Sequence, residues 1–453
     1  MRKHSNPAGA RAQSFEESFH RLISPGRLKE LWKEHGPKPR GQKPKLSGPG
    51  LICSLVFHVV CGVGTLGAHV KQLLGLEISN AGLSQRRAAA GLKVFVAVVE
   101  AALEPLAQEG RHPGSFYRGM RLAGLDGSQF SVSNTPQLLG RLSKAVSRRF
   151  QAAFAKIPIS LLVELGTHQP LAVEVGAQQE SEWELSHRLI QKIQAGWLVI
   201  ADRLYGVGVF LNQLLVRGQT VGSHCLLRVK ADIKVKVQEV LKDGSALVKV
   251  FVADGKAHKK RGAVIVREIK GRVRRPHGKW VRVRLWTDLL DAAAYPAGEL
   301  LALYARRWEV ELFNRELKVD LRHAQLLHSH TVETVVQEIL ALVLAMTVLS
   351  QQRLAASEAG EEEPLRISFG QTLVLVRSLW LVVAAGEDLL TPLQIKGLVR
   401  RTMKIIAEQC LPKRRPRTCP RAVRQPIKGW PRLKNNSYAK GAVEYEVLNH
   451  GKV

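Results

Sequence analysis

The stretch YARRWEVELFNRELK, from Tyr304 to Lys318, decides how the rest of this 453-residue chain is interpreted. On an α-helix that turns by about 100° per residue, one carboxylate and several aromatic and cationic groups would share a single face. The members of that face are Tyr304, Arg307, Glu311, Arg315 and Lys318. Two other acids, Glu309 and Glu316, would lie roughly opposite, about 120–140° from Tyr304.

A neighbouring apolar stripe on the same helix is suited to burial against a core. It consists of Leu303, Val310, Leu317 and Leu321. Glu311 is therefore the acid that stands apart from the ordinary pattern of a surface helix. The alternative for this stretch alone is a solvated helix held by Arg–Glu pairs at helical spacing.

Two acids upstream favour a functional role for Glu311 over a solvated surface helix. Asp126 lies in MRLAGLDGSQFSV (Met120 to Val132), which is typical of a strand, and Asp202 ends the apolar run of WLVIADR (Trp197 to Arg203). Each acid has a structural alternative. Asp126 with Gly127 can simply open a turn, and an acid at the end of an apolar run occurs in many α/β proteins.

The order of predicted elements indicates an α/β fold of the ribonuclease-H-like class. The strands are expected at 120–132, 155–165, 169–177, 197–203 and 222–230, with helices at 182–195 and 205–217. This fold places its first and fourth strands side by side. Two acids carried by those strands can share a metal ion.

The charge of the chain points to a polyanionic partner. It has 68 Lys plus Arg against 38 Asp plus Glu, a formal net charge of +30 and a pI of about 10.3, and nucleic acid is the expected partner. A hydrophobic content of 45% separates it from short or low-complexity basic packing proteins. Its five cysteines are scattered and form no C-x-x-C pair, which argues against a disulfide framework and a zinc ribbon and fits a reducing cytoplasm.

No export signal or membrane span is expected. The amino terminus, MRKHSNPAGARAQSF, lacks the apolar core of a signal peptide. Two apolar runs, 339–349 and 372–385, are too short or interrupted by Arg377, so we expect buried helices. The expected location is the cytoplasm, in association with the nucleoid.

The regions around the core are predicted as five segments. A basic segment and linker cover 1–50, a helical DNA end-binding region covers 51–114, the catalytic domain covers 115–330 with a β-strand insertion at 231–290, a helical region covers 331–410, and a basic tail covers 411–453. The insertion has a Lys/Arg-bearing face that could meet DNA, or it is structural filler. The cationic, Pro-rich stretch before Tyr438 is expected to be extended, as a disordered tail or an arm along phosphates.

The region 51–114 contains a possible helix-turn-helix. A helix ending near Gly75, a turn, and a helix starting at Ser79 or Ser84 would carry Gln85, Arg86 and Arg87 on its first turns. The pattern is weak, because helix–Gly–helix sequences are common in α-helical domains. These three side chains are candidates for DNA contact or an exposed helix cap.

Asp126, Asp202 and Glu311 together suit metal-dependent phosphodiester chemistry. Two Mg²⁺ ions supply a deprotonated nucleophile and stabilise the leaving oxygen, and hard oxygen ligands hold such ions, with Mn²⁺ as a substitute. The neighbouring cations Arg203, Arg307, Arg315 and Lys318 would hold phosphates, and Tyr304 would donate a hydrogen bond or stack.

These residues carry a resemblance to a known family. The chain resembles the DDE transposases of bacterial insertion sequences, specifically insertion-sequence family four, which is marked by Y-x2-R-x3-E-x6-K. All four positions match with the right gaps at Tyr304, Arg307, Glu311 and Lys318, and Trp308 is also typical. DGS at Asp126, ADRLYG at Asp202 and the β insertion are similar to the family's arrangement, over roughly 51–430.

The resemblance implies a cut-and-paste transposase that binds the terminal inverted repeats of its element, cuts there and joins the ends to target DNA. It also implies that Arg307 and Lys318 contact end phosphates, that Tyr304 positions the flanking strand, and that a homodimer holds both ends. The alternatives are a ribonuclease-H-like nuclease or domesticated descendant without transposition, and a non-catalytic DNA-binding protein whose acids are structural.

Overall fold

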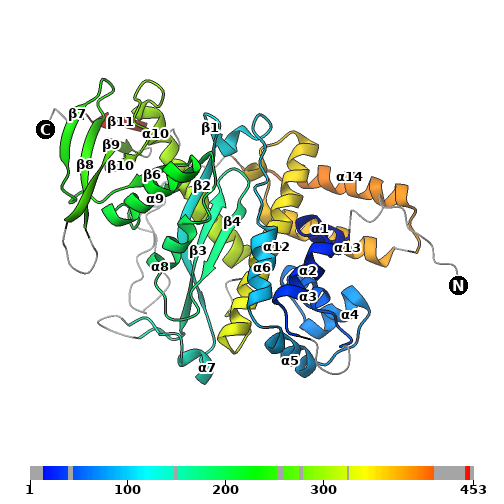
Figure 1. The fold of residues 1–453 in the computed structure, drawn as a ribbon. Coiled ribbons are helices and arrows are strands. Elements are labelled where there is room, and N and C mark those ends of the chain that lie inside the picture. The colour runs from blue at the N-terminus through cyan, green and yellow to red at the C-terminus, as the bar shows by residue number, and fades with distance from the viewer. Residues whose placement is uncertain are drawn as a thin grey trace, which may run out of the picture. The chain divides into compact units, whose positions relative to one another are not determined.

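The computed structural model describes residues 14–38, 44–146, 151–253, 260–274, 279–323, 326–386, 388–412 and 444–448. It divides into two compact units (Figure 1), each formed by segments distant in sequence. Unit 1 comprises Met1–Lys192 and Glu309–Cys410, and unit 2 comprises Ile193–Trp308 and Leu411–Val453. The five-segment division remains a prediction.

The amino-terminal part of unit 1 is helical, as the apolar periodicity predicts. The helices are α1 (Phe15–Leu22), α2 (Pro25–His35), α3 (Gly48–Cys61), α4 (Leu66–Leu74), α5 (Asn80–Ala90) and α6 (Lys93–Ala102). A Ser or Thr side chain accepts a hydrogen bond from the first turn of each of the first five helices. Such caps satisfy backbone N–H groups that have no partner within the helix.

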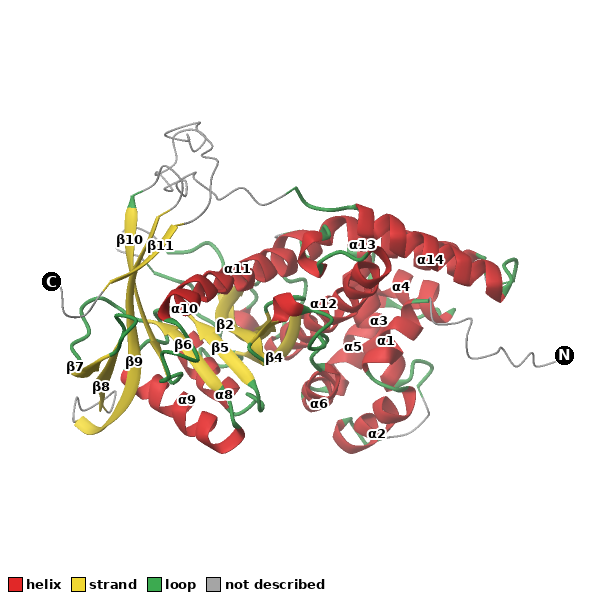
Figure 2. Cartoon of the chain, turned by 90° about the horizontal axis from the view of Figure 1, so that it is seen from above, coloured by secondary structure: helices red, strands yellow, loops and turns green. Residues whose placement is uncertain are grey.

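Three helices close unit 1 at its carboxyl end: α12 (Val332–Gly360), α13 (Phe369–Ala385) and α14 (Pro392–Glu408). Helix α12 contacts α3, α6, α14 and β4 and forms the centre of the unit; Figure 2 shows it together with α13 and α14. It is long and apolar enough to cross a membrane, but 94% of its apolar window is buried inside the protein. The predicted burial is confirmed for the run 339–349, whereas the run 372–385 is buried on one face only and leaves Val374, Leu381 and Val382 exposed.

Unit 1 also holds an antiparallel sheet. Its strands are β1 (Phe116–Tyr117), β2 (Met120–Ser131), β3 (Lys156–Glu164) and β4 (Gln169–Val175), in the order β4-β3-β2 with β1 on β2. The short helix α7 (Pro136–Leu139) follows β2, and α8 (Glu182–Ile190) packs on β2, β3 and β4. Strand β3 is buried along most of its length, which makes it the core of this sheet.

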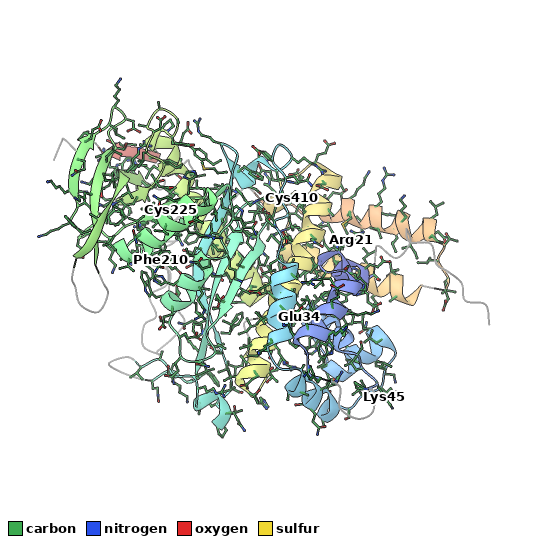
Figure 3. The ribbon with its side chains drawn as sticks, viewed as in Figure 1. Arg21, Glu34, Lys45, Phe210, Cys225 and Cys410 are labelled. Carbon is green, nitrogen blue, oxygen red and sulfur yellow. The ribbon has the colours of Figure 1, made fainter. Side chains whose placement is uncertain are left out.

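Unit 2 begins with β5 (Trp197–Ala201), α9 (Gly208–Val221) and β6 (His224–Arg228), where β5 and β6 are parallel. Figure 3 labels Phe210 on α9 and Cys225 on β6, and both are buried. The insertion follows as β7 (Lys236–Val240), β8 (Ala246–Ala253), β9 (Lys260–Arg274) and β10 (Trp280–Thr287). These strands pair antiparallel in chain order, and β10 also pairs with β6.

The order β2, β3, β4, α8, β5, α9, β6 is the one predicted for the ribonuclease-H-like α/β class, and the prediction is confirmed. Boundaries differ slightly, since α8 ends at Ile190 and α9 begins at Gly208. After the insertion come α10 (Ala297–Leu303), the 3₁₀ turn η2 (Tyr304–Arg307), α11 (Trp308–Arg315) and the π-helix η3 (Glu316–Leu321).

Candidate active site

Asp126 lies inside strand β2. Asp126 pairs with Leu161 of β3 and Gly127 pairs with Ser160, so the ladder continues on both sides of the Asp-Gly pair. The backbone N–H of Gly127 donates to Oδ1 of Asp126 over 3.0 Å. The alternative that this Asp-Gly pair opens a turn is therefore wrong.

The helical stretch that carries Glu311 packs directly on the face of β2 that carries Asp126. Residues 124, 126, 128 and 130 share one face of the strand, because side chains alternate along a strand. A Cβ atom added to Gly124 would lie 2.2 Å from Cγ2 of Val310. Further along, Nζ of Lys318 donates to Oγ of Ser128 over 3.2 Å. Asp126 is thus between two contact points whose helical partners flank Glu311.

The stretch from Tyr304 to Lys318 is not one regular α-helix. The angular positions calculated from the sequence at about 100° per residue therefore do not hold along its whole length. It starts as a 3₁₀ turn, becomes α-helical at Trp308 and continues as a π-helix from Glu316. The apolar stripe is nevertheless buried at Val310, Leu317 and Leu321.

The side chains expected on the shared face differ in exposure. Tyr304 is buried, with 9% of its surface exposed. Arg307, Glu311 and Lys318 are half-buried, and Arg315 is exposed. Burial and the charge of Lys156 lower the pKa of the Lys318 ammonium.

Asp202 lies in unit 2, directly after β5, as predicted. Its Oδ1 accepts from the backbone N–H of Leu204 over 2.7 Å, and its carbonyl accepts from Tyr205 over 3.2 Å. These bonds fix the turn that ends the strand. Strand β5 contacts the 3₁₀ turn η2, which carries the Tyr and the Arg of the signature. Arg203, the residue after Asp202, is exposed.

The three candidate metal ligands are divided between the two units. Among the described residues, no group of three or more His, Cys, Asp or Glu side chains is placed to hold a metal ion. Asp126 and Glu311 belong to unit 1, whereas Asp202 belongs to unit 2. The donor chemistry fits Mg²⁺, since all three are carboxylates, and their sharing of ions stays a prediction.

The expected helix-turn-helix elements are present in unit 1. Helix α4 ends before Gly75, which has a left-handed backbone with φ of 67°, and α5 begins after the cap Ser79. Gln85 is exposed, and the guanidinium of Arg86 lies 5.8 Å from the centre of the Trp32 ring. Whether these two side chains read DNA stays a prediction.

Arg87 has a different environment from the one expected. Its guanidinium donates to Oγ of Ser329 over 3.0 Å, to the carbonyl of Thr334 over 2.7 Å and to Oε1 of Gln337 over 3.3 Å. These bonds tie α5 to the start of α12. The interpretation of Arg87 as an exposed cap is wrong, because its side chain is half-buried and bonded; whether it also contacts DNA stays a prediction.

The basic insertion of unit 2 is partly structural. Arg267 is fully buried and donates to Oγ of Ser245 over 2.8 Å and to the carbonyl of Tyr295 over 2.6 Å. At the far end of β9, Arg272 and Arg274 lie within 4.6 Å and 5.0 Å of the Trp280 ring centre.

A strand near the carboxyl end, β11 (Glu444–Leu448), pairs antiparallel with that end of β9. Its Glu444 and Glu446 form ion pairs with Arg274 and Arg272. The cationic face of the insertion is thus partly neutralised by the chain itself. The cationic stretch that precedes β11, expected to be extended, lies outside the described residues.

Sequence reasoning missed a buried charged cluster beneath the Glu311 stretch. Glu309 and Glu316 both contact His168, which is fully buried, and Glu316 also contacts the buried Arg353. These acids therefore face the protein interior. A lone His and a lone Arg far apart in the sequence give no pattern that would have revealed the cluster.

Known transposases resemble this chain over part of its length. The model of the transposase DDE domain family matches residues 149–348, which include Asp202, Glu311 and Lys318 but not Asp126. The chain is 25% identical over 315 residues to the transposase InsG of insertion sequence element IS4 from Escherichia coli (strain K12), covering 69% of this chain and 70% of that protein.

A solved structure is also similar at a low level. It is the cryo-EM structure of the piggyBac transposase synaptic complex with hairpin DNA, with a TM-score of 0.44 and 10% identity over 88% of this chain and 87% of that chain. A likeness this distant adds nothing to the assignment made from the element order.

Proposed function

We propose that this chain, which belongs to the DDE transposases of the insertion-sequence type, cleaves DNA at the ends of its element and transfers those ends into target DNA. Cut-and-paste transposition of this kind needs a metal-dependent nuclease and strand-transfer centre. Asp126, Asp202 and Glu311 are the proposed catalytic carboxylates. The cytoplasm, at the nucleoid, is the proposed location.

One observation carries this proposal. Within unit 1, the strand face that holds Asp126 packs against the helical stretch that holds Glu311, through the contacts of Gly124 with Val310 and of Ser128 with Lys318. Asp126 lies within a regular strand, where its ladder partners hold the backbone still. Such preorganisation of acids from separate elements is what a two-ion nuclease centre requires.

The three carboxylates are the groups that would hold divalent ions. DDE transposases use such ions, and we propose two Mg²⁺, with Mn²⁺ as a substitute, because hard carboxylate oxygens suit both. When bound, the ions would lower the pKa of the attacking water or hydroxyl and neutralise the leaving oxygen.

The cations around the carboxylates would hold the DNA backbone. Arg307 and Arg315 can each bind a phosphate through two N–H groups, and Lys318 acts as a point charge. The lowered pKa of Lys318, caused by burial and by Lys156, supports an anion-binding role at that end of the stretch. Arg203 and Tyr304 are further proposed DNA contacts, as are Gln85 and Arg86 at the element end.

DNA cleavage tests the proposal directly. The substrate is a duplex that carries the element's own terminal sequence, with Mg²⁺, and the variants are Glu311→Ala and Lys318→Ala. We expect Glu311→Ala to bind the duplex and cut nothing. Lys318→Ala should bind the duplex more weakly, and its affinity should depend less steeply on salt concentration because one phosphate contact is lost. Glu408→Ala, an exposed carboxylate on α14, is the matched control.

The outcomes separate the candidate functions. If Glu311→Ala cleaves DNA normally, the proposed three-carboxylate site is ruled out and a non-catalytic DNA-binding protein is favoured. Cutting without joining to a target plasmid would favour a nuclease or a domesticated descendant. Joining of two ends in one complex would support both transposition and the proposed homodimer.

A further inference from the structure

The two acids on the inner side of the Glu311 stretch meet at a single histidine. His168 lies in the turn between β3 and β4 and is fully buried. Its Nδ1 lies 2.7 Å from Oε2 of Glu316, and its Nε2 lies 3.2 Å from Oε2 of Glu309. One imidazole therefore bridges two carboxylates that are seven positions apart, or about two helical turns.

This geometry calls for the protonated form of the ring. A neutral imidazole donates from only one nitrogen, whereas ionised carboxylates only accept, so both contacts are satisfied together by the imidazolium. Burial works against the charge, and so does Arg353, but the charge of Glu316 and the hydrogen bonds of both carboxylates raise the pKa of His168.

Helix α12 completes the cluster. One guanidinium nitrogen of Arg353 donates to Oε1 of Glu316 over 2.9 Å, and the other donates to the carbonyl of Thr167 over 2.9 Å. Ser350 donates to the carbonyl of His168 over 3.0 Å. Arg353 and His168 hold the pKa of the buried Glu316 down at about 2, against its burial. Two cations thus balance two carboxylates away from water, as buried charges require.

The backbone at His168 shows that this side chain is held in place despite a cost. Its φ is 58°, in the left-handed region where glycine is favoured. A histidine is strained there by comparison. The turn hydrogen bond from its N–H to the carbonyl of Glu164, 3.0 Å long, would be available to any residue. The bridging contacts are specific to the ring.

We propose that His168 is a positioning residue that sets the place of the Glu311 stretch over β2. Its two contacts grip the stretch before and after Glu311, at Glu309 and Glu316. A single contact would leave the helix free to turn or slide about that point, whereas two contacts on one rigid ring fix both. The second contact is also where the α-helix becomes a π-helix.

This inference rests on the proposed catalytic role of Glu311. Loss of the bridge would let that carboxylate shift by a fraction of an ångström to an ångström, and misplacement on that scale can cost about 100-fold in rate. Binding of DNA depends on cations elsewhere on the stretch and on other elements. Cleavage of bound DNA should therefore suffer far more than binding.

The experiment compares His168→Gln with His187→Gln, a histidine on α8 outside the cluster. Single-turnover cleavage of a pre-bound end duplex gives the rate of the bound complex, and titration without metal gives the affinity. We expect His168→Gln to lower the cleavage rate at least about tenfold and to leave the affinity within about twofold, while His187→Gln changes neither. Thermal unfolding of the metal-free proteins checks that each variant is folded.

Imidazole NMR of the metal-free wild-type protein is the readout that does not depend on activity. The His168 signal, assigned by sequential backbone and side-chain correlations in the wild-type protein, should show both ring nitrogens protonated at pH 7.5. A neutral ring at that pH would overturn the inference, even if the variant fails to fold. The inference would also be overturned if the ring is doubly protonated but His168→Gln cleaves bound DNA as fast as the wild-type protein.

Failure of this inference differs from failure of the proposed function. If Glu311→Ala cuts nothing and His168→Gln cuts normally, the carboxylate site stands and the positioning role is lost. If Glu311→Ala itself cuts normally, the proposed function is lost, whatever His168 does.

Discussion

The close approach of β2 to α11 predicts a strong effect from a single methyl group at Gly124. An alanine Cβ at this position would lie 2.2 Å from Cγ2 of Val310 and 2.6 Å from Cδ2 of Leu165. Both neighbours are fully buried, so neither can move into solvent. Overpacking of this kind costs about 1–3 kcal/mol, which corresponds to a fall in melting temperature of about 2–12 °C.

The functional effect should exceed the loss of stability. The backbone at Gly124 has no need of positive φ, so the substitution acts through space alone. It pushes the strand that carries Asp126 away from the stretch that carries Glu311. A separation increased by about 1 Å would lower cleavage of bound end DNA about 100-fold.

The assay pairs thermal unfolding with single-turnover cleavage. Gly262→Ala is the matched control, because Gly262 is also a strand glycine without positive φ and has open space at its Cβ position. The double variant Gly124→Ala with Val310→Ala removes the crowding methyl groups of Val310, although not that of Leu165, and should recover part of the cleavage lost by Gly124→Ala alone. If Gly124→Ala behaves as Gly262→Ala does in both measurements, the strand and the helix do not approach in this way.

Three further predictions concern other parts of the chain. Arg87→Ala should lower the free energy of unfolding by about 1–3 kcal/mol and leave the salt dependence of DNA binding unchanged; a shallower dependence would restore Arg87 as a DNA contact. Burial and the neighbouring His69 lower the pKa of His58 to about 4, so its contribution to stability is present above pH 6.5 and is lost as the pH falls through 4. The melting temperature should drop over that interval, and less so in His58→Gln. Replacing Glu444 and Glu446 with Gln frees two arginines of β9 and should give tighter, more salt-sensitive binding of non-specific DNA, measured by titration at several salt concentrations; unchanged affinity would mean that this face does not bind DNA.

The sequence by itself was sufficient for features that depend on local pattern. A short apolar run predicts β3, and the apolar periodicity predicts the helices of 51–114, because each residue's neighbours in the chain decide these elements. The position of Asp202 after a strand followed in the same way. The candidate acids could also be selected from the sequence, because their spacing from cationic and aromatic residues can be measured along the chain.

Local pattern also misled at particular residues. Asp126 with Gly127 has the composition of a turn, yet pairing with β3 holds both in a strand, because the ladder outweighs the local preference. Arg87 reads as an exposed residue on a short polar helix, yet its partners are more than 240 positions away. No window of sequence contains both ends of such a contact.

The buried cluster shows the same limit at the candidate site. Glu316 was expected to lie opposite the important face of its helix, and it does, but tertiary packing brings His168 and Arg353 against it from 148 and 37 positions away. Periodicity tells which residues share a face; it does not tell what covers that face. The acids and the order of strands were therefore determined by the chain itself, whereas the packing of β2 on the Glu311 stretch and the histidine bridge beneath it were decided by tertiary structure, because burial makes charges seek partners wherever the fold supplies them.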